Sequence, residues 1–158
     1  MAFDAFLKIV GVDGESRDER HQGEIEIDSY SWGESQSAAA GGGGGGGGAG
    51  KVQLQDFHFV ARTSKASPVM FFACATGQHF PEATLSLRRA GEDPLDYIKI
   101  TLSDCLVSSY LQEGVAGSST VPTDQFSLNF AKIEFTYVPQ GADGKAGPPI
   151  TRAYDRRS

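Results

Sequence analysis

Residues 95–110, LDYIKITLSDCLVSSY, alternate apolar and polar side chains in the pattern of a long β-strand. The preceding segment, ATLSLRR at 83–89, alternates in the same way, and the turn AGEDP at 90–94 joins the two. We therefore expect an antiparallel hairpin with a long second arm. One face of that arm is expected to carry Ile98, Ile100, Leu102 and Leu106, and the other face Lys99, Thr101, Ser103 and Cys105.

Four more segments have strand character. Residues 3–10 are apolar on both faces, which predicts that both are covered. Residues 52–62 (VQLQDFHFVAR) alternate with a change of phase at Asp56, and residues 125–139 (QFSLNFAKIEFTYVP) change phase after Phe130. Such changes predict bulges or bends that let a sheet curl.

The fourth segment, GEIEIDSYSWG at 23–33, has two different faces. Because side chains alternate along a strand, small polar residues are expected on one face together with isoleucine, and acidic and aromatic residues on the other. The first face holds Ile25, Ile27, Ser29 and Ser31, and the second holds Glu24, Glu26, Asp28, Tyr30 and Trp32.

The segment SPVMFFACATG at 67–77 is the one convincing helix. Ser67 is expected as the N-cap, Pro68 at the first helical position and Gly77 as the left-handed stop. A helix over residues 68–76 with almost no polar face has to pack, either against a sheet or against a partner.

These elements predict a mainly β fold, either a sandwich or a barrel, with one short α-helix on the side. The 158 residues fit a single domain, 1–158. Two segments of this domain lie outside the expected strands and helix. An extended glycine-rich loop is expected at 38–50, and the polar tail 141–158 is expected to be flexible unless it docks.

Composition excludes several classes of function. The net charge of −6 argues against a phosphate-driven nucleic-acid binder, and no apolar run is long enough for membrane insertion. The N-terminus lacks the features of a secretory signal peptide, and the two cysteines, Cys74 and Cys105, suit a reducing cytoplasm. Charge is also unevenly distributed. Residues 1–28 hold eight carboxylates against three basic side chains, whereas residues 140–158 hold four basic side chains against two carboxylates.

The stretch AAAGGGGGGGGAGK at 38–51 resembles a phosphate-binding loop, because Gly45 to Lys51 satisfy that motif up to the lysine. Val52 follows where the motif needs a hydroxyl to hold magnesium. The residues after it alternate like a strand, although a phosphate loop must open a helix. Nucleotide binding is therefore the third-ranked interpretation.

No catalytic or metal-binding constellation is found. The three histidines, His21, His58 and His79, lie at no ligand spacing from one another or from a cysteine. We expect no enzyme activity, no cofactor and no metal. Trp32 and Tyr30 could stack on a sugar, so a monomeric β-sandwich that binds a ligand or carbohydrate is the alternative function, although a buried strand end is favoured for this pair.

The order of several short segments resembles the Hcp (haemolysin-coregulated protein) family, the tube proteins of bacterial type VI secretion. These segments are GES, SWG, AGKV, ACATGQHFP and LNFAKI, and the similarity runs from Phe6 to about Gln140. The resemblance implies a β-barrel of two sheets, sandwich-like, with one short α-helix on the side, and it implies that this barrel assembles into hexameric rings, which stack into a hollow tube. It also implies a structural protein of virulence-associated secretion, not an enzyme.

The resemblance implies partners and a location as well. The partners are other copies of the chain, small secreted effector proteins that the ring lumen binds and chaperones, and the sheath and spike components of the apparatus. The protein would be cytoplasmic before firing and secreted afterwards.

Combining the resemblance with strand alternation, we expect Ser29 and Ser31 to face the lumen, and Tyr30 and Trp32 to face the subunit body or a neighbour. The glycine-rich loop is expected to reach the next ring. Because ordering glycines costs more backbone entropy than ordering other residues, stacking through this loop should be weak. The loop positions assigned to stacking are Ala38, Gly41, Gly45, Gly48, Gly50 and Lys51.

Overall fold

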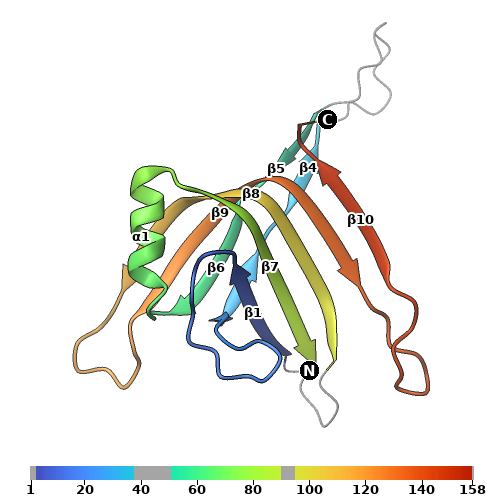
Figure 1. Cartoon of the computed structure of the whole chain (residues 1–158), viewed down its shortest axis with the longest axis horizontal. Helices are drawn as coiled ribbons and strands as arrows, with labels where there is room; N and C mark the ends of the chain where they lie inside the picture. Colours follow the sequence, from blue (N-terminus) through green and yellow to red (C-terminus); the bar gives the residue numbers. More distant parts are fainter. Residues whose placement is uncertain (1–2, 38–50, 90–94, 158) are drawn as a thin grey trace, which may run out of the picture.

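The protein is a rolled antiparallel β-sheet with one helix packed against it (Figure 1), and a computed structural model describes residues 3–37, 51–89 and 95–157. The main sheet has the order β2-β1-β7-β8-β9-β6-β3, with β10 beside β9, and β4 pairs with β5 in a small second sheet. The mainly β barrel with one short helix is thus confirmed. The elements are β1 (Phe3–Ile9), β2 (Ile25–Ile27), β3 (Ser29–Ser31), β4 (Glu34–Gln36), β5 (Val52–Leu54), β6 (Phe57–Arg62), α1 (Ser67–Thr76), β7 (His79–Arg89), β8 (Asp96–Glu113), β9 (Thr123–Tyr137) and β10 (Ile150–Asp155).

The barrel closes through residues 25–31. The sequence predicts one strand here, but the segment forms two strands, β2 and β3. β2 pairs with β1 at one end of the sheet order, and β3 pairs with β6 at the other end. Asp28 lies between β2 and β3, and its backbone N–H donates to the carbonyl of Val60 at 2.8 Å. Since β2 and β3 are consecutive in the chain, the two ends of the main sheet meet at Asp28.

Three neighbouring strands change their buried face at the same level of the barrel. In β8 the change occurs at Asp104, which has φ 53°, a left-handed conformation that aspartate tolerates better than most residues. The change in β9 is the one the sequence predicted. The buried side chains on either side of the change are Phe80 and Ala83 in β7, Leu102 and Cys105 in β8, and Phe130 and Ile133 in β9.

Because the buried face of β8 changes at Asp104, the predicted faces of this strand are wrong beyond that residue. Cys105 is fully buried, whereas Leu106 is only partly buried, so the two residues lie on the opposite faces from those predicted. The prediction was wrong because strict alternation was carried through Asp104, where the left-handed backbone conformation reverses it.

The helix starts differently from the prediction. Ala66 is the N-cap, and Ser67 is the first helical residue, so the assignment of Ser67 as N-cap is wrong. The Ser67 hydroxyl instead donates to the carboxylate of Asp124 and accepts the Ser64 N–H at 2.9 Å. The predicted stop is confirmed: Gly77 has φ 68°.

The tail at 141–158, predicted to be flexible unless it docks, does dock at residues 150–155, where it forms β10. β10 pairs with the C-terminal half of β9, and Tyr154 lies opposite Ile133. β6 pairs only with the N-terminal half of β9, so the remaining edge of β9 is open to another strand. The tail contains the β-branched and aromatic residues that suit this position.

Stacked aromatic rings fill the part of the barrel where β3 and β6 meet. Phe57 and Phe59 are 0% and 1% exposed, and their ring centroids lie 4.8 Å apart. Phe126 stacks on Phe59 at 5.1 Å, while Tyr30 and Trp32 stack on Phe57 at 6.0 and 5.8 Å. The closing strand is therefore attached to the core by its aromatic side chains.

Candidate functional site

The strand that closes the barrel separates its small and large side chains between two faces. Ser29 and Ser31 are exposed on the outside of the barrel, and Tyr30 between them is partly buried against Phe57. The prediction that Tyr30 and Trp32 share a face with Glu24 and Glu26 is wrong, because the alternation changes phase at Asp28. The side chains that face inward are those of Ile25, Ile27, Tyr30 and Trp32.

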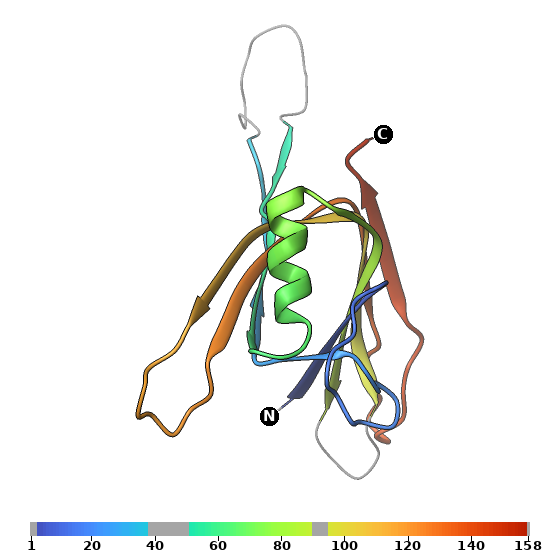
Figure 2. The same ribbon diagram turned by 60° about the vertical axis from the view of Figure 1, so that its left-hand side comes forward.

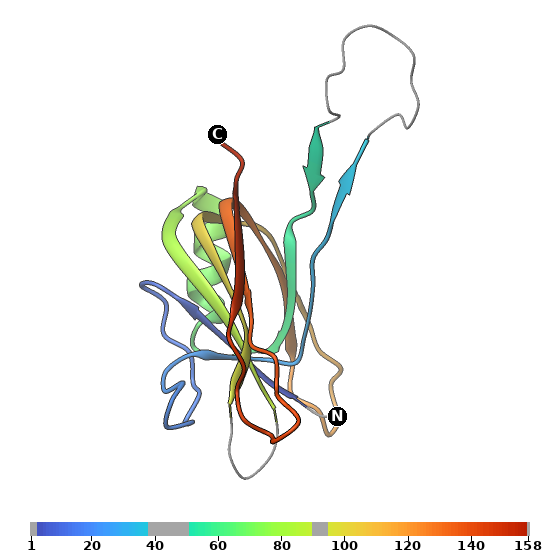
Figure 3. The ribbon, with the colours of Figure 1, turned by 90° about the vertical axis from the view of Figure 1, so that its right-hand side faces the viewer.

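The outer face around the two serines is polar and extends across neighbouring strands. Ser31 lies opposite the exposed His58 of β6, and Ser29 lies opposite Val60. Val60 in turn lies opposite Gln125 of β9, which is exposed. Sequence reasoning did not include His58 and Gln125 in this face, although His58 lies between the buried Phe57 and Phe59 and Gln125 directly precedes the buried Phe126. In Figure 3, β6 forms a side of the barrel that faces away from α1.

Trp32 lies at the rim of the core. Its ring stacks on Phe57 and also contacts Phe135, with centroids 5.9 Å apart. Phe57 also covers one face of the Tyr30 ring. An aromatic platform for a sugar needs open ring faces, so this arrangement gives little support to carbohydrate binding.

A two-stranded hairpin projects from one end of the barrel (Figures 2 and 3). It consists of β4 and β5, and it carries both ends of the glycine-rich segment. The bend predicted at Asp56 falls in the short break between β5 and β6. Lys51 is exposed at the end of the hairpin farthest from the barrel, next to Val52, whereas Ala38, Gly41, Gly45, Gly48 and Gly50 lie outside the described residues.

The residues after Lys51 rule out a phosphate-binding loop. β5 begins at Val52 and is a strand, whereas the loop requires a helix whose N-terminal amides face the phosphate.

The acidic segment at 10–24 lies at the opposite end of the barrel from the β4–β5 hairpin (Figure 1) and is held by His21. The His21 ring stacks on Phe6 at 4.4 Å. Its Nδ1 lies 3.1 Å from the Glu24 carboxylate, and its Nε2 lies 3.1 Å from a carboxylate oxygen of Asp96. This side chain therefore connects the segment to β1 and β8. It covers Phe6 on the outer face of β1, whereas Asp4, Lys8 and Val10 on that face are exposed, so the prediction that both faces are covered is wrong outside Phe6.

Arg88 makes a second connection to the same segment. Its guanidinium lies 2.6 Å from the Asp18 carboxylate and 3.2 Å from that of Asp4. The hydrogen bond from Arg88 lowers the pKa of Asp18 below its ordinary value. The carboxylate therefore stays ionised over a wide pH range, and this connection persists until acidic pH.

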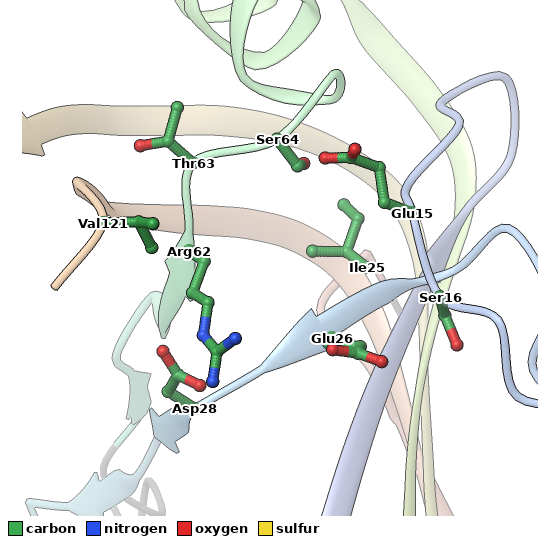
Figure 4. A pocket seen from close by; sticks show the side chains of 9 residues that line it. All are labelled: Glu15, Ser16, Ile25, Glu26, Asp28, Arg62, Thr63, Ser64 and Val121. Atoms are coloured by element: carbon green, nitrogen blue, oxygen red, sulfur yellow. The ribbon is translucent and has the colours of Figure 1, made fainter.

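A hollow of about 290 Å³ opens between the acidic segment, β2 and the end of β6 (Figure 4). Three carboxylates line it, from Glu15, Glu26 and Asp28, and one guanidinium, from Arg62. Figure 4 shows the Arg62 side chain directed toward Asp28. With more carboxylates than cations, the hollow suits a basic side chain from a partner.

The two ends of the barrel differ in chemistry. The end with the β4–β5 hairpin also holds the C-terminus (Figure 1), where Arg156 and Arg157 are exposed. The other end holds the acidic segment at 10–24. Among the described residues, no group of three or more histidine, cysteine or acidic side chains could hold a metal ion. Within those same ranges, no helix has the length and apolar character needed to cross a membrane.

Comparisons with known proteins identify the class to which this rolled antiparallel sheet, with its side helix and projecting hairpin, belongs. The family model described as "Type VI secretion system effector, Hcp" matches residues 6–137. The chain is 46% identical to protein hcp1 of Pseudomonas aeruginosa over 99% of its own length and 97% of that protein.

Solved structures of type VI secretion proteins are also similar to this chain. Hcp1 from Salmonella typhimurium has a TM-score of 0.79 at 33% identity, covering 99% of this chain and 96% of that one. A structure described as a type six secretion system protein has a TM-score of 0.90 at 29% identity, covering 98% and 96%. The chain belongs to the Hcp family, and it is a protein of the type VI secretion system.

Proposed function

We propose that this chain is the tube subunit of a type VI secretion system, forming hexameric rings that stack into a hollow tube. The observation that carries the proposal is the separation of surfaces on one barrel: a polar outer face, α1 on one flank and β10 on the other (Figure 1), and two chemically different ends. A ring requires different patches on the two flanks of a subunit, and a tube requires different patches at its two ends. Size-exclusion chromatography with negative-stain imaging tests it, since a monomer would instead support the ligand-binding alternative.

The polar face around Ser29 and Ser31 is proposed to line the lumen, where it binds small effector proteins before export. Small hydroxyl side chains leave room in a channel and can exchange hydrogen bonds with many partners. The tube would assemble in the cytoplasm with the sheath and spike components of the apparatus, and it would leave the cell on firing.

Ser31→Gln is expected to preserve the ring and to lower effector retention by about tenfold or more, about 1.4 kcal/mol, because the longer side chain occupies the lumen surface. Co-purification of a co-expressed type VI effector measures retention, and gel filtration measures the ring. Ser118→Gln, at an exposed loop serine, is the matched control and should change neither. If Ser31→Gln instead dissolved the ring, Ser31 would belong to a subunit contact.

Stacking is proposed to use two contacts. The glycine-rich loop at 38–50 would extend from the β4–β5 hairpin to the next ring. The basic end of one ring, with Lys51, Arg156 and Arg157, would face the acidic 10–24 segment of the next, including the hollow in Figure 4. Opposite charges at opposite ends support a head-to-tail arrangement.

Salt is therefore expected to shorten tubes without dissolving rings. Exposed ion pairs contribute about 0–1 kcal/mol each, and raising NaCl from ~0.05 to ~0.5 M shortens the Debye length from about 14 to about 4 Å. Tube lengths on negatively stained grids should fall across this range, while the ring peak in gel filtration stays in place. Tube lengths that do not change with salt would remove the electrostatic contact from the account.

A further inference from the structure

Two exposed apolar patches lie on different elements of the barrel. The helix patch consists of Val69, Phe71 and Phe72 on α1, which are 40%, 59% and 60% exposed. The sheet patch consists of Tyr137, Ile150 and Tyr154 on β9 and β10, which are 37%, 55% and 45% exposed. Surface patches of large apolar side chains commonly mark sites of protein association.

The helix patch forms a ridge. α1 buries Met70 and Ala73 on the side that packs against the barrel, so Val69 and Phe72, three positions apart, project on a different side. The first turn contains no acidic residue and the last turn no basic residue. A partner for this ridge therefore needs an apolar surface rather than a charged one.

The sheet patch forms a groove of about 450 Å³ between β10, the C-terminal half of β9 and the start of β4. Cross-strand pairing puts Ile150 beside Tyr137 and Tyr154 beside Ile133. Most of the lining is apolar or aromatic, and Glu34 and Arg152 add the charged groups. The volume is within the range of about 300–1,000 Å³ that holds drug-sized ligands, so the side chains of a helix ridge can enter it.

The ridge and the groove lie on opposite flanks. In Figure 1, α1 is at the left of the barrel and β10 at the right, and Figure 3 shows β10 in front with α1 behind it. Both flanks lie between the two ends assigned to stacking, and neither is the polar face of β3 and β6. A closed ring of identical subunits needs this arrangement, because each copy contacts its two neighbours through two different patches.

We propose that the α1 ridge of one copy docks in the β9–β10 groove of the next copy around the ring. The inference rests on the proposed ring and specifies its contact. Stable interfaces bury about 800 Å² per partner with an apolar centre and a polar rim. Phe72 and Phe71 supply apolar side chains from one copy, and Tyr154 and Ile150 supply them from the other. Arg152 lies between Ile150 and Tyr154 on β10 and adds one charged group to the groove.

Two double variants test the contact, one without the ridge (Phe71→Ser with Phe72→Ser) and one without the groove (Ile150→Ser with Tyr154→Ser). All four side chains are exposed, and circular dichroism should show both variants folded. Each variant alone is expected to be monomeric by native mass spectrometry. Mixed in equal amounts, they should form heterodimers but no rings, because the groove of the first variant still accepts the ridge of the second.

The outcomes separate this contact from the ring itself. If the unaltered chain forms rings and both variants also do, the ridge and groove are not the contact, and the proposed function stands. If the variants are monomeric but their mixture gives no heterodimer, the two patches do not bind each other. If the unaltered chain is itself monomeric, the ring proposal fails.

A crosslink gives a second measurement. In a Cys74→Ser background, Phe72→Cys combined with Ile150→Cys is expected to form disulfide-linked multimers up to the hexamer on mild oxidation. The control Phe72→Cys with Val10→Cys, where Val10 is exposed at the end of β1, should stay unlinked. Equal crosslinking of both pairs would overturn the proposed contact.

Discussion

Phe57→Ala is expected to lower the free energy of unfolding by about 3–5 kcal/mol, the usual cost of deleting a buried phenylalanine ring. Phe57 is fully buried and stacks on Phe59, Tyr30 and Trp32. Its loss leaves a cavity where β3 closes the barrel, and it removes the support of both aromatic side chains of the closing strand. Urea unfolding at fixed protein concentration measures the change.

Val115→Ala is the matched control for Phe57→Ala. Val115 is 76% exposed in the loop between β8 and β9, so its truncation should change the unfolding free energy by about 0.5 kcal/mol or less. Similar losses for the two variants would show that the aromatic stack does not hold the closing strand.

Cys105 is expected to resist thiol reagents in the folded protein, about a thousand-fold relative to an ordinary cysteine. Burial, together with the neighbouring Asp104 charge, raises the pKa of the Cys105 thiol from 9.0 to about 12. The thiolate is the reactive form, so a pKa raised this far reduces its population at pH 8 about a thousand-fold. Labelling of a Cys74→Ser variant with a thiol reagent, before and after unfolding, measures the difference.

The labelling rate of Cys105 reports which face of β8 carries its side chain. A thiol on the predicted face, opposite the core, would be accessible and would react at an ordinary rate. Cys105→Ser in the folded protein is the companion variant, in which the half-buried Cys74 should label readily. Fast labelling of Cys105 without unfolding would contradict the change of face at Asp104.

Local patterns predicted much of the fold. Apolar–polar alternation identified β7 and β8, the phase change in β9 and the break at Asp56, and the proline and glycine signals located the helix. Each depends on residues close together in the chain. The family resemblance added what alternation cannot give, namely that these strands roll into a single barrel.

What the sequence did not predict depends on contacts between distant residues. The split of residues 25–31 at Asp28 follows from pairing with two different strands. β10 forms because β9 is longer than β6 and leaves an open edge. The Ser67 hydroxyl binds Asp124, 57 positions away, instead of capping its own helix. The groove beside Trp32 likewise exists only once β9, β10 and β4 are assembled.

Native mass spectrometry of the purified chain at micromolar concentration and moderate salt tests the central claim most directly. The account predicts a closed assembly of six copies, together with larger species in multiples of six as salt is lowered. A protein that stays monomeric across this range, or that forms open series without a preferred number of subunits, would contradict a ring-forming tube subunit.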